Sequence, residues 1–330
     1  MQTRVLGKDK LAVSALGLGG RRLSDAYTET RGDTSKAQAL IDHAIERGLT
    51  HIDTSDSYDA TRNESLFGKI LSGKRDRVVL ATKFGFVTRD DGSRGICGHP
   101  DYVPQACDAS LKRLNTDVID LYYLHRVDPD VPIEDTVGAM VRLKEAGKIR
   151  HIGLSEAGPE TLRRATKVHA IAALQSDYSL WTRDYEADTL PACKELGIGF
   201  VAYYPLGSGF LAGAIREVDA LGTEDSRRNH PRLQDENFDR NTTLLLKLRD
   251  IATEKGCKLG QLALAWILAR SPDYVAIPGT SQIPHLDDNI DAADITLSAD
   301  DMARIDAIFP RQGAVAGERV AKSRLKDLNR

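Results

Sequence analysis

Short apolar runs rich in β-branched residues alternate with longer amphipathic segments along almost the whole chain. There are eight runs, at 15–18, 50–52, 78–81, 118–124, 149–154, 172–174, 199–203 and 275–277. The apolar spacing between them predicts helices over 35–47, 64–71, 103–114, 134–146, 159–168, 186–196 and 244–270, the last with a break at 256–259. Strands joined by helical crossovers pair in parallel, so eight such units predict an α/β fold of the (β/α)8 or TIM-barrel type.

The sequence around this alternation indicates how the chain is organised. Segment 4–13, with a turn at 7–10, predicts a β-hairpin placed before the barrel. A doubly wound sheet is the rival fold, but it has a glycine-rich turn that opens a helix, and here Gly19 and Gly20 lead into a polar loop. Segment 207–240 is the longest without a clear period, and we interpret it as a functional loop. We therefore expect one barrel domain over residues 1–330.

Composition restricts the partners and the compartment. The chain has 45 Lys and Arg against 48 Asp and Glu, a net charge of −3, which argues against a nucleic-acid partner. No run approaches the ~18 to 20 apolar residues of a membrane span, and the first residues lack the apolar stretch of a signal peptide. Cys97, Cys107, Cys193 and Cys257 show no metal-binding spacing. We expect a cytoplasmic protein with reduced thiols, no bound metal and no membrane partner; the sequence defines no oligomeric state.

Polar residues end three of the predicted strands, and in a barrel such residues converge at one rim. Asp53, Lys83 and His125 end the second, third and fourth strands, and Tyr58 lies in the loop after Asp53. Each alone has a structural explanation: a turn former, a solvated cation, a strand-end imidazole or a capping aromatic. Together they predict that Lys83 lowers the pKa of Tyr58 from near ~10, that Asp53 holds Lys83, and that His125 polarises a carbonyl group. Such a set suits carbonyl reduction with a hydride from a cofactor.

Seven motifs follow one another over residues 48–207, within a resemblance that covers about residues 4–308. They are GLTHIDTSDSY at 48–58, Asn63 and Glu64 with Gly68, ATKFG at 81–85, DVIDLYYLHRVD at 117–128, GKIRHIGLSE at 147–156, QSDYSLW at 175–181 and AYYPLG at 202–207. On these motifs the chain resembles the aldo-keto reductase superfamily, in particular its bacterial branch of aldehyde and ketone reductases of about this length. The resemblance implies a nicotinamide cofactor that lies extended across the C-terminal mouth of the barrel.

The resemblance also implies roles for individual residues. The catalytic residues would be Tyr58, Asp53, Lys83 and His125. Those at the carboxamide would be Ser155, Gln175 and Glu156, the last in place of the Asn of other branches, with Tyr203 stacked on the nicotinamide ring. The remaining cofactor contacts would be Gly19, Gly20, Leu206, Gly207, Ser208, Gly209, Thr280, Ser281, Gln282, His285, Asp288 and Asn289. A helix N-terminus after Thr280 would favour a phosphate.

The chain departs from the family pattern at three places. Tyr204 stands where the family commonly has Ser, and Arg21 and Arg22 stand where branch members carry small or apolar residues. Residues 281–285 hold Ser, Gln and His where a Lys or Arg normally lies near the adenosine. Because a 2′-phosphate is best recognised by a paired cation, we expect NADPH as cofactor but with relaxed preference, and NAD as a possible substitute.

We therefore predict an NADP-dependent oxidoreductase that reversibly reduces an aldehyde or ketone to an alcohol. Tyr58 would act as general acid in reduction and as general base in oxidation. The candidate contacts to the small carbonyl substrate are Arg21, Tyr27, Phe86, Arg126 and Trp181. One alternative is a non-catalytic binding or regulatory subunit of the same superfamily. Another, a metal-dependent barrel hydrolase, would need clustered histidines, whereas the eight in this chain are scattered.

Overall fold

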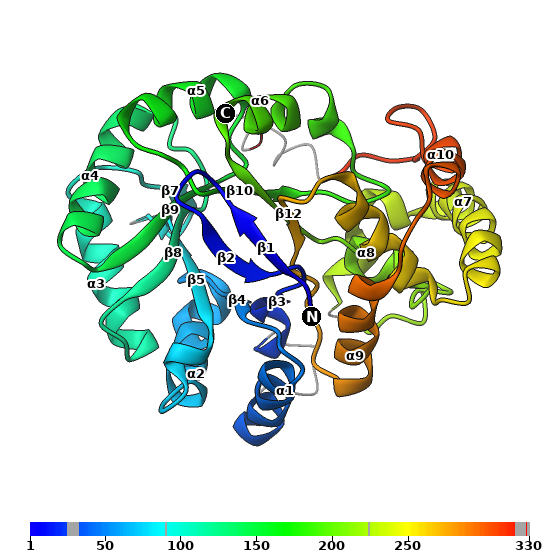
Figure 1. The fold of residues 1–330 in the computed structure, drawn as a ribbon, viewed down its shortest axis with the longest axis horizontal. Coiled ribbons are helices and arrows are strands. Elements are labelled where there is room, and N and C mark those ends of the chain that lie inside the picture. The colour runs from blue at the N-terminus through cyan, green and yellow to red at the C-terminus, as the bar shows by residue number, and fades with distance from the viewer. Residues whose placement is uncertain (25–32, 90, 224, 321–327, 329–330) are drawn as a thin grey trace.

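A computed structural model of the protein describes residues 1–24, 33–89, 91–223, 225–320 and 328. Eight parallel strands lie side by side in the order β3 (Leu18–Gly19), β4 (His51–Asp53), β5 (Val79–Phe84), β8 (Ile119–Leu124), β9 (Ile149–Ser155), β10 (Ala173–Asp177), β11 (Gly199–Tyr203) and β12 (Tyr274–Ala276). The sheet curls round until Leu16, just before β3, bridges Ala276 of β12. The backbone N–H of Gly17 donates to the carbonyl of Ala276 at 2.9 Å. The predicted TIM barrel is confirmed (Figure 1).

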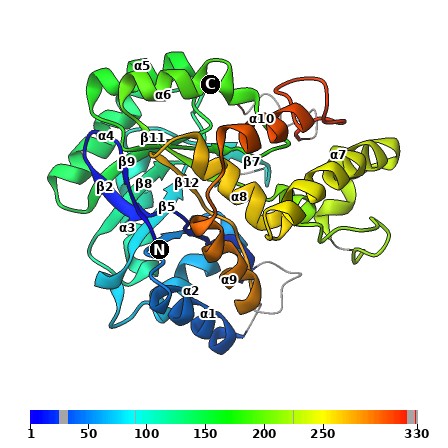
Figure 2. The same cartoon turned by 45° about the vertical axis from the view of Figure 1, so that its right-hand side comes forward.

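Helices form the outer layer around the strands (Figures 1 and 2). They are α1 (Thr34–Glu46), α2 (Arg62–Ile70), α3 (Tyr102–Leu114), α4 (Ile133–Glu145), α5 (Pro159–Val168), α6 (Thr189–Leu196), α7 (Asp235–Glu254), α8 (Leu259–Arg270), α9 (Ile283–Asp291) and α10 (Ala299–Ile308). Their apolar faces bury side chains such as Phe67, Met140 and Trp266 against the sheet. Because the strands lie between these helices and the barrel interior, they read in the sequence as continuous apolar runs.

The predicted helices are present, with two corrections. The helix predicted over 186–196 begins only at Thr189, because residues Asp184–Glu186 form a separate 3₁₀ turn. Helix α7 begins at Asp235, inside the segment that we interpreted as a loop. Only Asn241 is buried in the first ten residues of α7, and their polar composition conceals the helical period. The loop interpretation of 207–240 therefore fails for its last six residues.

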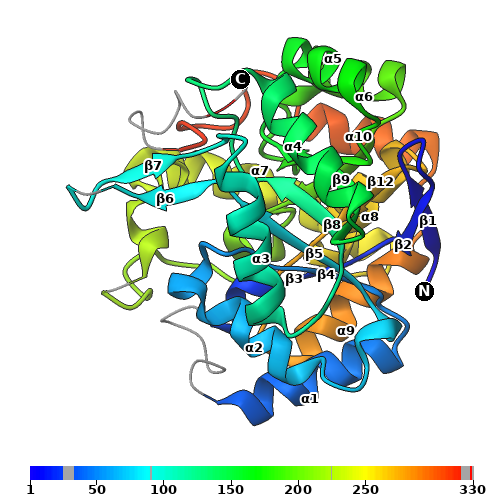
Figure 3. The same cartoon turned by 90° about the vertical axis from the view of Figure 1, so that its left-hand side faces the viewer.

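The predicted N-terminal hairpin is also present. Strands β1 (Thr3–Leu6) and β2 (Leu11–Ser14) pair antiparallel, and Figure 3 shows the hairpin lying across one end of the barrel. Leu6 and Leu11 are buried in the cluster that fills the barrel interior. A Cβ atom on Gly199 at the start of β11 would lie 2.6 Å from Leu6 Cδ2, so the hairpin leaves no room for a larger residue there. The interior is therefore closed at the amino ends of the strands.

A second hairpin lies at the opposite end of the barrel (Figure 3). It consists of β6 (Phe86–Thr88) and β7 (Arg94–Ile96), and it follows directly after β5. The sequence analysis did not predict it, because each strand is only three residues long and shows no clear alternation of apolar and polar residues. It brings Arg94 to the same rim as the ends of β4, β5 and β8.

Candidate active site at the carboxyl ends of the strands

The ends of β4 and β5 bring Asp53 and Lys83 into direct contact. Lys83 Nζ donates to Asp53 Oδ1 and, at 2.7 Å, to the carbonyl of Thr54, while Asp53 Oδ2 accepts from Gln175 Nε2 at 2.7 Å. Asp53 and Lys83 are at most 2% exposed, so they form a buried ion pair. Burial lowers the pKa of Lys83, but Asp53 and Tyr58 outweigh it and hold that pKa above its usual value. Lys83 is therefore a fixed positive charge at neutral pH.

Tyr58 lies beside this pair, at the start of a 3₁₀ turn after β4. Its ring centroid is 5.1 Å from Lys83 Nζ. Although part of the residue is exposed, the surrounding protein desolvates the phenol and raises its pKa; Lys83 and Arg21 act in the opposite direction. The net effect is a pKa of Tyr58 above the usual value for tyrosine. The prediction that this pKa is lowered is therefore wrong for this arrangement. Desolvation of the phenolate is the reason, and Lys83 limits the rise.

His125 follows β8, and its imidazole is neutral. Burial and then the nearby cations, Arg126 first among them, hold its pKa well below the usual value. The Nδ1 atom lies 3.1 Å from Ser55 Oγ. When Ser55 donates this hydrogen bond, the ring proton lies on Nε2, which is then a donor. The ring stands edge-on to Tyr58, with centroids 6.0 Å apart, so Tyr58 and His125 share one surface of the rim.

Two polar residues in this region were missed by the sequence analysis. Ser55 contacts His125, as described, and its Oγ lies 3.4 Å from Asp56 Oδ1. Burial and then Glu64 raise the pKa of Asp56 to about 7. A Ser and an Asp within a run of small polar residues are typical of turns. No feature of the sequence therefore distinguishes Ser55 and Asp56 from their neighbours as site residues.

Two other motif residues, both on α2, hold the strands of the site in place. Asn63 accepts from Thr54 Oγ1 at 2.5 Å and donates to Gly20 O at 3.0 Å, which joins α2 to the ends of β3 and β4. Glu64 is fully buried and accepts from Thr82 Oγ1 and Arg113 Nε, both at 2.6 Å. These residues fix the strands that carry Asp53 and Lys83, so their roles are structural.

The five predicted substrate contacts are not placed alike. Phe86 packs edge-on to His125, with centroids 4.6 Å apart, and Arg126 is buried beside it, donating to His125 O at 2.6 Å. Arg21 lies with its guanidinium carbon 6.0 Å from the Tyr58 ring centroid. Trp181 is 5% exposed, stacks on Phe210 and lines a cavity. Tyr27 lies outside the described residues.

Two of the departures from the family pattern meet each other. Arg21 Nη1 donates to Tyr204 Oη at 2.8 Å, which joins the end of β3 to the end of β11. Tyr204 is 44% exposed and adopts a left-handed backbone with φ of +48°. Its ring centroid is 5.2 Å from that of Tyr203. Arg21 and Tyr204 therefore form a contact at the rim next to Tyr58.

The residues assigned to the nicotinamide lie together at the ends of β9, β10 and β11. Ser155 Oγ accepts from Arg126 Nη1 at 3.2 Å, which leaves its hydroxyl proton for a further acceptor. Gln175 uses Nε2 on Asp53, which leaves its Oε1 as an acceptor. A carboxamide needs one donor and one or two acceptors, so this pair fits it. Glu156 is different, because four protein groups already donate to it: Asp177 N, Tyr203 Oη, Tyr185 Oη and Arg319 Nη2.

The residues assigned to the phosphates lie in a turn and at the start of a helix. Gly207, Ser208 and Gly209 have consecutive φ values of +53°, +56° and +96°, and the N–H groups of Gly207 and Gly209 donate to Tyr204 O and Leu206 O, both at 2.9 Å, so these two amides are used within the turn. The predicted helix after Thr280 is α9, whose first-turn amides favour an anion. The start of α9 therefore fits a phosphate.

The side chains that we expect near an adenosine differ in exposure. His285 is exposed on the first turn of α9, Asn289 is buried, and Asp288 pairs with Lys258 Nζ at 2.7 Å. Ser281 and Gln282 are half-buried ahead of the helix. Lys258 is thus a basic residue at this end of the site that the sequence analysis did not consider.

Two of the glycines assigned to the cofactor are required by packing. A Cβ atom on Gly19 would lie 2.7 Å from Ile277 O, and one on Gly20 would lie 2.4 Å from the Phe67 ring. These contacts close the barrel between β3, β12 and α2. The glycines therefore have a structural explanation whether or not a cofactor contacts them.

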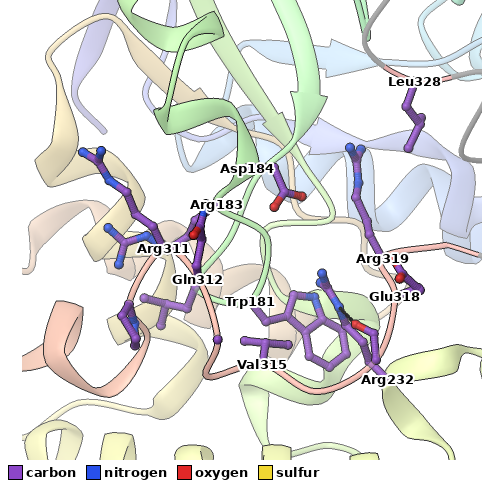
Figure 4. Close-up of a pocket in the computed structure, with 14 residues that line it drawn as sticks. Trp181, Arg183, Asp184, Arg232, Arg311, Gln312, Val315, Glu318, Arg319 and Leu328 are labelled. Atoms are coloured by element: carbon purple, nitrogen blue, oxygen red, sulfur yellow. Dashed lines mark hydrogen bonds between the residues drawn. The ribbon is translucent and has the colours of Figure 1, made fainter.

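A cavity of about 400 Å³ lies between the C-terminal segment and the residues around Trp181 and Arg183 (Figure 4). Its lining includes Trp181, Arg232 and Arg319, and none of Tyr58, Asp53, Lys83 and His125. Within the described ranges, no group of three His, Cys, Asp or Glu side chains could hold a metal ion, and no helix is long and apolar enough to cross a membrane. The four cysteines form no disulfide in this structure.

This fold and this site define a TIM-barrel protein with a buried lysine–carboxylate pair, a tyrosine and a neutral imidazole at the carboxyl ends of its strands. A family model, the aldo/keto reductase family, matches residues 15–309. The chain belongs to the aldo/keto reductase family, and the family supports a carbonyl-reducing oxidoreductase.

Individual relatives agree with this membership. The chain is 44% identical over 315 residues to "Probable aldo-keto reductase 1" of Glycine max, covering 95% of this chain and 90% of the relative. It is similar to the holo form of aldo-keto reductase AKR11C1 from Bacillus halodurans, with a TM-score of 0.79, 30% identity and coverage of 94% and 97% of the two chains. A thermostable aldo-keto reductase, Tm1743, in complex with the inhibitor epalrestat matches with a TM-score of 0.76, 30% identity and coverage of 93% and 100%.

Proposed function

We propose that the protein reversibly reduces an aldehyde or ketone to an alcohol with a nicotinamide cofactor, NADPH by preference. The observation that carries this proposal is the convergence of Tyr58, Lys83 and His125, three groups with different chemistry, at one rim of the barrel. The phenol is a proton donor, the ammonium is a fixed charge beside it, and the imidazole is neutral. A non-catalytic subunit would not need this set, so that alternative is not favoured.

The proton in this reaction is moved by Tyr58. In reduction the phenol donates its proton to the developing alkoxide, and in oxidation the phenolate takes the proton from the alcohol. Desolvation keeps Tyr58 protonated at neutral pH, which suits it as an acid. Lys83, held by Asp53, stabilises the phenolate that remains after the transfer. Asp53 is thus a positioning residue for Lys83.

The carbonyl group is oriented by His125. With its ring proton on Nε2, the imidazole donates a hydrogen bond to the carbonyl oxygen and polarises it. Because its pKa lies well below the usual value, the imidazole stays uncharged and does not compete with Tyr58 as a proton source. Phe86, packed against its edge, limits the positions that the ring can adopt.

The cofactor would be held by residues from three strand ends and two turns. Ser155 and Gln175 would hold the carboxamide, the ring of Tyr203 would stack on the nicotinamide, and the turn at 207–209 and the start of α9 would face the phosphates. When bound there, a reduced nicotinamide supplies the hydride for the carbonyl carbon. The four free thiols support the proposal that the protein works in a reducing, cytoplasmic compartment.

The test is a turnover assay with a panel of aldehydes, ketones and sugars, followed by the absorbance of the reduced cofactor. We expect consumption of NADPH that depends on the carbonyl compound, and formation of NADPH from NADP⁺ with the corresponding alcohol. The matched control is the same assay without the carbonyl compound. If the protein bound the cofactor but turned over none of the panel in either direction, the proposal of a carbonyl reductase would be wrong.

Cofactor preference should depend on His285. Replacing His285 with Arg is expected to raise the ratio of kcat/KM for NADPH to that for NADH by about 10-fold or more, since a hydrogen bond to a charged group contributes ~1.5 to 3 kcal/mol.

The matched variants are His285→Ala and Lys258→Met, each measured with both cofactors. A large preference for NADPH that survives His285→Ala would show that another residue recognises the 2′-phosphate. If that preference disappeared in Lys258→Met, the residue would be Lys258.

A further inference from the structure

The segment after α10 returns to the carboxyl ends of the strands. We name residues 310–320 the C-terminal strap. Its backbone is fixed at Ala316, whose N–H donates to Asn241 Oδ1 at 2.9 Å and whose carbonyl accepts from Asn241 Nδ2 at 3.0 Å. Arg232 Nε donates to Gly317 O at 3.3 Å. In Figure 4 the side chain of Arg319 extends from the strap along one side of the cavity.

Arg319 is 7% exposed, and its guanidinium has four acceptors. Nε donates to Asp177 Oδ2 at 2.9 Å, and Nη1 donates to Tyr185 Oη at 2.8 Å. Nη2 donates to Glu156 Oε1 at 2.7 Å and to Tyr203 Oη at 3.2 Å. One side chain of the strap therefore joins groups that follow or end β9, β10 and β11. A planar guanidinium suits such a set, because its donors point in fixed directions.

Arg319 also determines the state of Glu156. Burial alone raises the pKa of Glu156, but Arg319 and Arg126 outweigh burial and hold that pKa below its usual value. Three protein donors bond Glu156 Oε1 and one bonds Oε2, so both carboxylate oxygens are engaged within the protein. Its backbone is held in the left-handed region with φ of +58°, a conformation that persists only when the surroundings fix it. Glu156 is therefore a charged partner of Arg319 and not a free ligand.

Tyr203 is held by the same network. Its hydroxyl donates to Glu156 Oε1 at 2.8 Å and accepts from Arg319 Nη2. Tyr203 is the last residue of β11, and its ring is half-buried at the rim. The direction in which this ring faces therefore depends on a carboxylate that is itself held by the strap.

We propose that Arg319 is a positioning residue for cofactor binding, and that the C-terminal strap and the nicotinamide site are coupled through Glu156 and Tyr203. This proposal rests on the proposed function, because it takes the ends of β9, β10 and β11 as the nicotinamide site. The strap must be docked for Tyr203 to present its ring and for Ser155, next to Glu156, to keep its place. Cofactor binding in turn stabilises the docked strap, since coupling between two sites is reciprocal.

The primary test is Arg319→Met. We expect the Kd of NADPH, measured by quenching of tryptophan fluorescence, to rise about 10- to 100-fold, within the usual range of coupling between sites. The value of kcat at saturating NADPH should stay within about threefold of wild type, since Tyr58, Lys83 and His125 keep their contacts. Hydrogen exchange of residues 310–320 should be faster in the variant, and in the wild-type protein NADPH should slow it.

Three companion variants separate positioning from general destabilisation. Arg319→Met combined with Glu156→Gln removes the carboxylate left without its partner, so it should recover most of the lost affinity; Asp177, whose pKa burial already raises, can take up a proton. Arg319→Lys keeps the positive charge but lacks the planar set of guanidinium donors. It should bind NADPH more weakly than the wild-type protein and more tightly than Arg319→Met. Arg311→Met removes an exposed arginine of the same strap, which pairs with Glu186, and should change neither affinity nor exchange near Arg319.

The outcomes can be told apart. Wild-type protein that binds no NADPH or NADH would overturn the proposed function. Wild-type protein that binds the cofactor while Arg319→Met and Arg319→Lys bind it equally well would overturn only the coupling. A double variant with no recovery of affinity would also overturn it, because a residue that merely adds stability would give additive losses. If Arg319→Met did not fold, Arg319→Lys would decide the question by the same criterion.

Discussion

Tyr58→Phe is expected to lower kcat for carbonyl reduction by about 10²- to 10⁴-fold, because a positioned proton donor contributes that much to the rate. The substitution removes one hydroxyl group and keeps the ring that packs beside Lys83 and His125. The Kd of the cofactor should therefore change little. Single-turnover reduction at saturating cofactor is the measurement to use, since it reports the chemical step and not product release.

The matched control for this variant is Tyr274→Phe. Tyr274 begins β12, at the end of the barrel away from the site, and is half-buried. Removing its hydroxyl should leave single-turnover rates at the wild-type value. If Tyr58→Phe also retained most of the wild-type rate, another group would have to supply the proton, and Asp56, whose pKa is raised to about 7, would be the next residue to test.

Lys83→Met is expected to move the pH dependence of alcohol oxidation upward by about 1 to 3 pH units. Oxidation needs the phenolate of Tyr58, so its rate rises with pH through the pKa of that residue. Lys83 opposes the rise of this pKa caused by burial, and its removal lets the pKa go higher. At a fixed pH below both values, oxidation should slow by about 10- to 10³-fold, since each pH unit is a factor of ten in phenolate. Reduction needs the phenol and should keep its rate to higher pH.

The control for this prediction concerns the Asp53 carboxylate, which loses its cationic partner in Lys83→Met. In Lys83→Met, the buried Asp53 keeps only the hydrogen bond from Gln175 and lacks a cation. Asp53→Asn in the same chain removes that charge, so the double variant should be the better folded of the two. The pH at which its alcohol oxidation rate rises should still be higher than in the wild-type protein. If an active variant showed the same pH dependence as the wild-type protein, the electrostatic role of Lys83 would be excluded.

The barrel and the rim that holds the candidate site could be predicted from the sequence for a physical reason. Strands buried on both faces appear as continuous apolar runs, and helices appear as a 3.6-residue apolar period. Each element, and so their order, can therefore be predicted from a short stretch of sequence. Once the strands are known, parallel pairing places Asp53, Lys83 and His125 at one rim without further information. The structure confirms this juxtaposition, because Lys83 contacts Asp53, and Tyr58 lies beside both Lys83 and His125.

What could not be predicted depends on distances and burial that the sequence does not contain. The pKa of Tyr58 is a balance between desolvation and the charge of Lys83, and only the geometry shows which is larger. Arg319 lies beyond the matched family segment, in a stretch without a period, so nothing marks it as different from the exposed Arg311. The surroundings of Trp181 could not be predicted either, because its ring both stacks on Phe210 and lines a cavity.

The closure of the barrel by the N-terminal hairpin also has a consequence for synthesis. Arg4 in β1 donates to the carbonyls of Ser271 and Tyr274, the latter 270 residues away along the chain. At a translation rate of about 5 to 20 residues per second, the hairpin waits about 15 to 55 s for these partners to be made. During that time Leu6 and Leu11 have no barrel interior to enter, and β3 has no neighbour on its β12 side. The nascent chain, more than the finished barrel, is therefore the form whose open strand edge is exposed to aggregation.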